Sequence, residues 1–68
     1  MDKRTWQGAK GTYSIQSEKR GDRVHAEAWG PLDASGKTQS NGRIAWKEAK
    51  TREDAEALLI AELQRRNA

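Results

Sequence analysis

The fold is decided by residues 12–29, which read TYSIQSEKRGDRVHAEAW. Apolar and polar side chains alternate on both sides of the central KRGD, the pattern of two strands that each bury one face. Gly21 suits the first central position of a type II′ turn. The stretch therefore predicts an antiparallel hairpin with strands at 12–18 and 23–29.

Side chains of a strand point alternately to its two faces, so the hairpin sorts into an apolar face and a polar face. The apolar face is expected to carry Tyr13, Ile15, Val24, Ala26 and Ala28. The opposite, open face is expected to carry Ser14, Gln16, Glu18, Arg23, His25, Glu27 and Trp29.

The remainder of the chain predicts one more strand and a helix. A polar loop over 30–41 and a turn at Asn41-Gly42 lead into a strand at 43–49, RIAWKEA. Its alternation places Ile44 and Trp46 on the apolar face and Arg43, Ala45 and Lys47 on the open face. A helix is expected over 51–67, with Thr51 as its N-cap. Its apolar residues recur at helical spacing and should cover the sheet: Ala55, Leu58, Leu59, Ile60 and Leu63.

These elements predict an α+β fold in which a three-stranded antiparallel sheet, within 12–49, packs on one C-terminal helix. The 68 residues leave room for a single domain, 1–68. Residues 1–11 are interpreted as a basic N-terminal arm in which only Trp6 needs a docking site. A short extra strand in the arm is the alternative.

The composition excludes several classes of function. The absence of cysteine removes disulfides and thiolate metal sites, and one histidine is too few for an imidazole cluster, so no metal and no cofactor are expected. No set of side chains offers an acid, a base and a nucleophile in combination, so the chain is not expected to be an enzyme. The polar start and the lack of a long apolar run predict a cytoplasmic protein that does not enter membranes.

The charge distribution points to the sheet as the binding surface. The net charge is +3, and residues 1–50 hold ten Lys and Arg against six Asp and Glu. A cationic face that includes an aromatic ring suits nucleic acid. The candidate binding residues are Arg23, His25, Trp29, Arg43, Lys47, Gln16 and Ser14, with further arm contacts from Lys3, Arg4 and Lys10. A merely solvated face is the alternative, since half-buried sheets normally expose charged residues.

Three short motifs, VHAE at 24–27, NGRIAW at 41–46 and TREDA at 51–55, add a resemblance. In order and type they resemble the strands and helix of the plant ethylene-response-factor DNA-binding domain. The N-terminal arm-binding domains of phage and transposon tyrosine recombinases have the same plan of three strands and a helix. The resemblance implies a sheet that enters the DNA major groove. It also implies that Arg43 matches a DNA-contacting arginine and that Trp29 replaces another.

Two hypotheses of function follow. The first is a small DNA-binding protein, of phage or plasmid type, whose open face contacts the major groove or the phosphates. The second is a protein interaction module, such as a small inhibitor or accessory subunit, that uses the open face or a strand edge. Either protein could be a homodimer. Salt dependence distinguishes the two, because phosphate binding weakens steeply with salt and an apolar protein interface does not.

Overall fold

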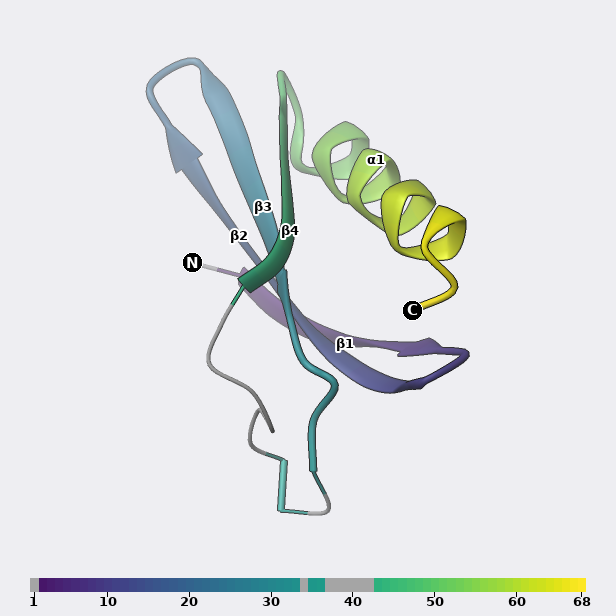
Figure 1. Cartoon of the computed structure of the whole chain (residues 1–68). Helices are drawn as coiled ribbons and strands as arrows, with labels where there is room; N and C mark the ends of the chain where they lie inside the picture. Colours follow the sequence, from purple (N-terminus) through teal and green to yellow (C-terminus); the bar gives the residue numbers. More distant parts are fainter. Residues whose placement is uncertain (1, 34, 37–42) are drawn as a thin grey trace.

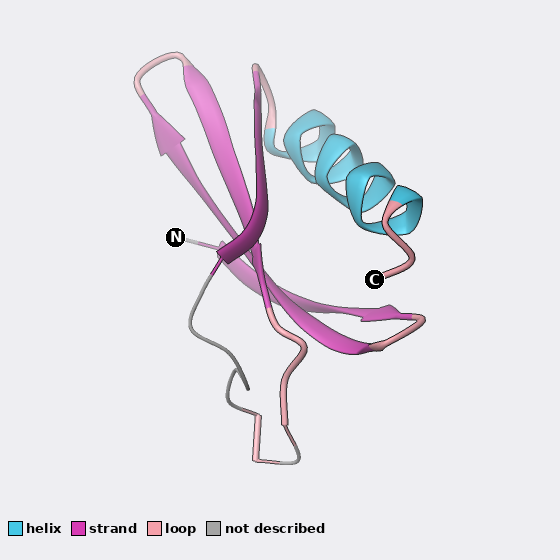
Figure 2. Ribbon diagram, in the orientation of Figure 1, coloured by secondary structure: helices cyan, strands magenta, loops and turns pink. Residues whose placement is uncertain are grey.

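The computed structural model describes residues 2–33, 35–36 and 43–68, and it shows an antiparallel sheet covered on one face by a C-terminal helix (Figures 1 and 2). The elements are β1 (Asp2–Gly8), β2 (Gly11–Arg20), β3 (Arg23–Trp29), β4 (Arg43–Ala49) and α1 (Arg52–Arg65). The sheet order is β1-β2-β3-β4. The predicted α+β class is confirmed, whereas the prediction of three strands is wrong because the described residues form four. The predicted turn at Asn41-Gly42 and half of the 30–41 loop lie outside the described residues.

The additional strand is β1, which occupies most of the segment predicted to be a loose arm. It pairs with β2 along its whole length, from Asp2 opposite Ser17 to Gly8 opposite Gly11. Trp6 lies opposite Tyr13 with ring centroids 6.0 Å apart, so Tyr13 supplies the docking site that Trp6 needs. Apart from Trp6 the strand has little to bury, and its pairing with β2 is what orders it.

The hairpin at the centre of the sheet agrees with the prediction. Strand β3 has the predicted bounds, and β2 extends one residue before and two beyond the predicted strand. Arg20 pairs with Arg23 across a two-residue turn, and Gly21 has a φ of +65°, as the first central position of a type II′ turn requires.

The core lies between the sheet and α1. Its residues are Tyr13, Ile15, Val24, Ala26, Ala28, Ala45, Ala55, Leu59, Leu63 and Ala68. The predicted apolar faces of β2 and β3 are therefore confirmed. The helix contacts the sheet through the line of Ala55, Leu59 and Leu63, which recur every fourth residue. Leu58, predicted to face the sheet, is 50% exposed because it lies to one side of that line.

A bulge reverses the two faces of β4 after its second residue. Ala28 pairs with Ala45 and Trp29 pairs with Arg43, so Ile44 is an extra residue between the two pairs. A shift of one residue moves every later side chain to the other face. Ala45 is therefore buried against the helix, and Trp46, predicted to be in the core, is 50% exposed on the open face.

The same bulge corrects the placement of Lys47. This residue was predicted on the open face, but its ammonium nitrogen lies 3.9 Å from a carboxylate oxygen of Glu62 on α1. Lys47 therefore belongs to the helix side of the sheet. Arg43 precedes the bulge and keeps its predicted place on the open face.

Both ends of α1 are closed by hydrogen bonds. Thr51 accepts from the Asp54 N–H at 3.1 Å and is the N-cap, as predicted. The helix ends two residues earlier than predicted, because Asn67 takes a left-handed conformation with a φ of 58°. The N–H of Ala68 then donates to the Leu63 carbonyl, which completes a Schellman-type C-cap. No helix in the described ranges is long and apolar enough to cross a bilayer.

The last turn of α1 is tied to the bulge of β4. Glu62 accepts hydrogen bonds from Arg65 and Arg66, which lower the pKa of its carboxyl group from 4.5 to about 2. The two arginines follow Glu62 by three and four residues, the spacing at which side chains of a helix meet. The Arg66 guanidinium also donates to the carbonyl of Ile44 at 2.7 Å. The extra residue of the bulge is therefore held by the end of the helix.

Candidate nucleic-acid interface

The open face, opposite α1, is arranged in rows because paired residues of neighbouring antiparallel strands lie side by side. One row consists of Lys3, Gln16, Glu27 and Trp46. The next row consists of Thr5, Ser14, Trp29 and Arg43. A third, further from the 30–42 connection, consists of Glu18, His25 and Glu48.

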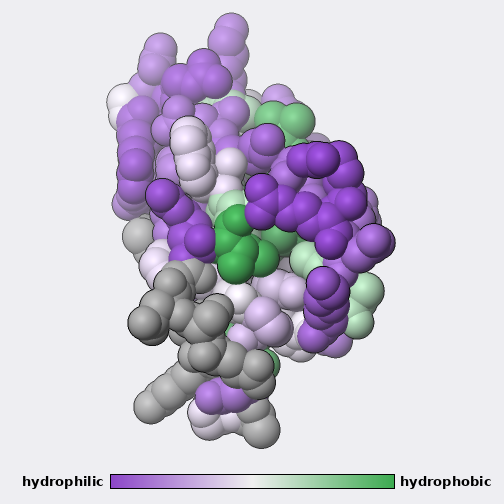
Figure 3. Space-filling model, viewed as in Figure 1, coloured by the Kyte–Doolittle hydropathy of each residue, from purple (hydrophilic) through white to green (hydrophobic). Residues whose placement is uncertain are grey.

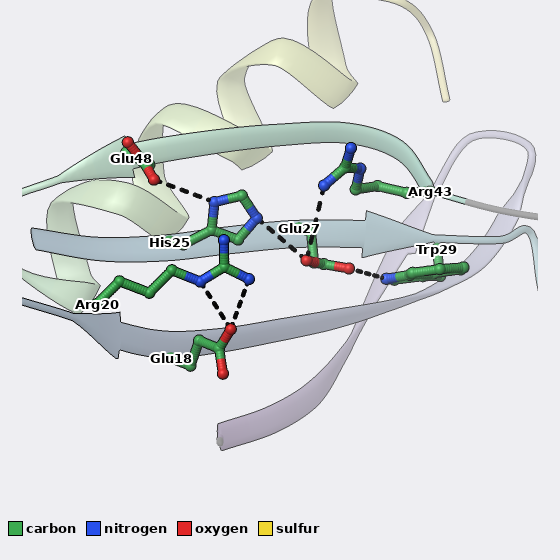
Figure 4. Close-up of polar contacts among 7 residues, drawn as sticks. All are labelled: Glu18, Arg20, His25, Glu27, Trp29, Arg43 and Glu48. Atoms are coloured by element: carbon green, nitrogen blue, oxygen red, sulfur yellow. Dashed lines mark hydrogen bonds and ion pairs between the residues drawn. The ribbon is translucent and has the colours of Figure 1, made fainter.

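Glu27 is the centre of a polar network on this face (Figure 4). Its carboxylate accepts a hydrogen bond from the indole N–H of Trp29 at 2.6 Å and lies 3.1 Å from Nε2 of His25. The guanidinium of Arg43 lies 3.9 Å away. Since the indole is bonded at its nitrogen, the Trp29 ring is held in one orientation, and the charge of Glu27 is balanced locally.

His25 is more enclosed than the sequence predicts. It was expected to face solvent, but only 4% of its surface is exposed. Trp46 stacks on the imidazole with ring centroids 5.3 Å apart, and Glu48 lies 3.4 Å from Nδ1. The bulge explains this difference, because it places Trp46 on the open face beside His25.

The exposed ring of Trp46 is also close to a cation. The guanidinium carbon of Arg43 lies 5.9 Å from the ring centroid, at the outer limit of a cation–π contact. The open face therefore presents the Trp46 indole between an imidazole and a guanidinium. With Trp46 added to Trp29, this face has more aromatic surface than the sequence predicts.

A groove of about 490 Å³ lies on the open face over β2. Its walls come from Lys3 and Thr5 on β1, from Trp29 on β3 and from Leu32 beyond β3. The N–H of Leu32 donates to the Thr12 carbonyl at 2.8 Å, which holds that wall in place. Ser14 and Gln16 come from the middle strand and form the floor.

Ser14 is the unusual residue of this groove. It is 6% exposed, and its hydroxyl has no hydrogen-bond partner among the described residues. Buried hydroxyl groups normally have a partner, because leaving one unpaired costs about 1–3 kcal/mol. The groove thus contains a donor and acceptor that nothing in the described structure satisfies.

The structure brings most of the predicted binding residues together. Those on the open face are Ser14, Gln16, His25, Trp29 and Arg43, with Arg23 at the end of the same face of β3. Lys47 is the exception. Of the predicted arm residues, Lys3 joins the open face, Arg4 pairs with Glu56 of the helix at 3.0 Å, and Lys10 lies in the β1–β2 turn.

Sequence reasoning missed Trp46 as a surface residue. One signal was available, because strict alternation places Glu48 on the same face as Trp46, and a carboxylate does not belong under an apolar helix. Thr5 and Leu32 were also missed. Neither carries a sequence signal, since their places in the groove depend on β1 pairing and on the backbone bond of Leu32.

The open face carries both signs of charge. Glu18 is paired with Arg20 at 2.6 Å. Glu27 is contacted by Trp29, His25 and Arg43. Lys3 and Arg23 take part in no ion pair within the described ranges, so they are available to an anionic partner. In the view of Figure 3, hydrophilic residues cover most of the surface, and the most apolar area lies near the start of β4.

The fold and this face define an α+β protein with a four-stranded antiparallel sheet, one face of which is rich in aromatic and cationic groups and is covered by no helix or strand of the described residues. Comparisons with protein-family models, with curated proteins and with solved structures gave no match to the chain. In the part of the chain that the structure describes, no group of three or more His, Cys, Asp or Glu side chains is arranged to hold a metal ion.

Proposed function

We propose that the protein binds nucleic acid, with DNA as the expected ligand, through the open face of its sheet. The observation that carries this proposal is the placement of two tryptophans, Trp29 and Trp46, at diagonal positions of adjacent strands on that face. Diagonal neighbours in a sheet are about 7–8 Å apart, so both rings are within reach of one bound strand.

The chemistry of the face suits bases and phosphates together. An indole ring stacks on any base and contributes about 1–3 kcal/mol per base to binding. Lys3 and Arg43 supply positive charge near the rings, and Arg23 adds charge at the far end of β3. Guanidinium groups bind phosphates well. Because several acidic residues share the face, we expect modest affinity that depends on salt.

A second candidate function is supported by the edge of β1. Among the described residues this strand has a neighbour on one side only, β2, and Lys3, Arg4 and Thr5 are exposed. An unpaired strand edge offers a row of backbone N–H and carbonyl groups to an extended peptide. The protein would then be an interaction module that adds a strand from its partner to the sheet.

Fluorescence anisotropy with labelled DNA distinguishes these functions. We expect binding at about 50 mM salt that weakens at least tenfold at about 200 mM, because released counterions drive phosphate binding. The second function predicts no such binding. Trp46→Ala should weaken binding, whereas Leu58→Ala is the matched control, since Leu58 is equally exposed but lies on the helix. Equal binding by both variants would contradict the proposed use of the open face.

A further inference from the structure

The groove over β2 combines a tryptophan wall, a polar floor and a cation at its rim. We infer that this groove receives one unstacked nucleobase, so that the protein prefers single-stranded to duplex nucleic acid. This inference rests on the proposed function and specifies the form of the ligand. The groove volume of about 490 Å³ lies within the range of small-molecule sites.

The floor of the groove favours a ligand that both donates and accepts hydrogen bonds. The Ser14 hydroxyl can do both, and it is buried without a partner among the residues described. The amide of Gln16, two residues along the same strand, likewise offers a donor and an acceptor to the groove. The edge of a nucleobase presents the same mixture of groups, whereas an aliphatic side chain would leave Ser14 unsatisfied.

The wall favours a flat ligand. Trp29 lines the groove, and its bond to Glu27 at 2.6 Å fixes the indole before any ligand arrives. A ring that is already oriented loses little entropy on stacking, which benefits affinity. Leu32 lines the groove as well and adds apolar contact.

The rim supplies a cation where the backbone of a bound strand would pass. Lys3 lines the groove from the edge strand and has no ion-pair partner in the described part of the chain. A base in a duplex is stacked on both sides and paired along its edge, so it could reach Ser14 only by leaving the helix, which costs a few kcal/mol. A base in a single strand avoids that cost. The geometry of the groove therefore selects single strands.

The test compares three labelled probes: an oligothymidine of about 10 nucleotides, an abasic strand of the same length, and a duplex of the same length. The wild-type protein should bind oligothymidine at least about tenfold more tightly than the other two probes. Ser14→Val, which fills the floor, should remove most of this preference. Ser14→Ala should weaken oligothymidine binding about two- to tenfold, the effect of one hydrogen bond.

Controls separate the groove from the rest of the face. Gln7→Ala changes the open face of the neighbouring strand β1 outside the groove and should bind like the wild type. Thermal melts identify any variant that does not fold. Ser14→Ala only removes an atom and adds no bulk, so it still tests the groove if Ser14→Val does not fold. If Ser14→Val and Ser14→Ala bind oligothymidine normally while Trp46→Ala does not, the groove inference is wrong and the proposed function stands. A wild-type preference for duplex also overturns the inference, and failure to bind any probe at low salt overturns both.

Discussion

Trp46→Ala tests the bulge and the binding face in one variant. Truncation of a fully buried tryptophan costs about 3–5 kcal/mol, which would unfold a domain of this size. The Trp46 ring is 50% exposed, so about half of that cost, roughly 2 kcal/mol, is expected. At about 4–8 °C per kcal/mol, the melting temperature should fall by about 8–16 °C, and the variant should remain folded.

The assay pairs circular dichroism melts with DNA anisotropy. Trp46→Ala should lose about 1–3 kcal/mol of binding, which corresponds to about 5- to 150-fold in Kd. Tyr13→Ala is the comparison for stability, because Tyr13 is 2% exposed and its loss should leave the chain largely unfolded. If Trp46→Ala unfolds as Tyr13→Ala does, Trp46 is in the core and the bulge is misplaced. If it folds and binds DNA normally, Trp46 is not part of the interface.

Three further predictions concern charge and close packing. Arg43→Ala should weaken DNA binding and Lys47→Ala should not, because only Arg43 lies on the open face; equal effects in the same titration would contradict the assigned faces of β4. Ionised Glu62 should stabilise the fold above about pH 4.5, its ordinary pKa, and this contribution should decline as the pH falls towards 2, so urea unfolding of the wild type and of Glu62→Gln should converge over that range. Gly8→Ala should destabilise the protein in thermal melts, since a Cβ at this position would lie 2.8 Å from the carbonyl carbon of Ala68; an unchanged melting temperature would refute this packing.

The residues that could be placed from sequence are those with strong local signals. Alternation gave the apolar and open faces of β2 and β3, Gly21 marked the hairpin turn, and Thr51 marked the start of the helix. These features depend on a few neighbouring residues, so the sequence contains the information needed to find them.

The features that could not be predicted depend on distant partners. Strand β1 has one large apolar residue, Trp6, and becomes a strand because β2 offers it a free edge. The bulge at Ile44 depends on how Ala28 and Ala45 fit under the helix, and strict alternation cannot indicate an extra residue. The candidate site could not be predicted for the same reason. The bulge places Trp46 on the open face, and the pairing of β1 places Thr5 in the groove.

The bond from Arg66 to the Ile44 carbonyl joins the last turn of the helix to the residue that decides which face of β4 carries Trp46. A slip of β4 by one residue would turn Trp46 inward, and it would also move the Ile44 carbonyl away from Arg66. The contact between the end of the helix and the bulge therefore stabilises the register that displays this tryptophan over the register that would bury it.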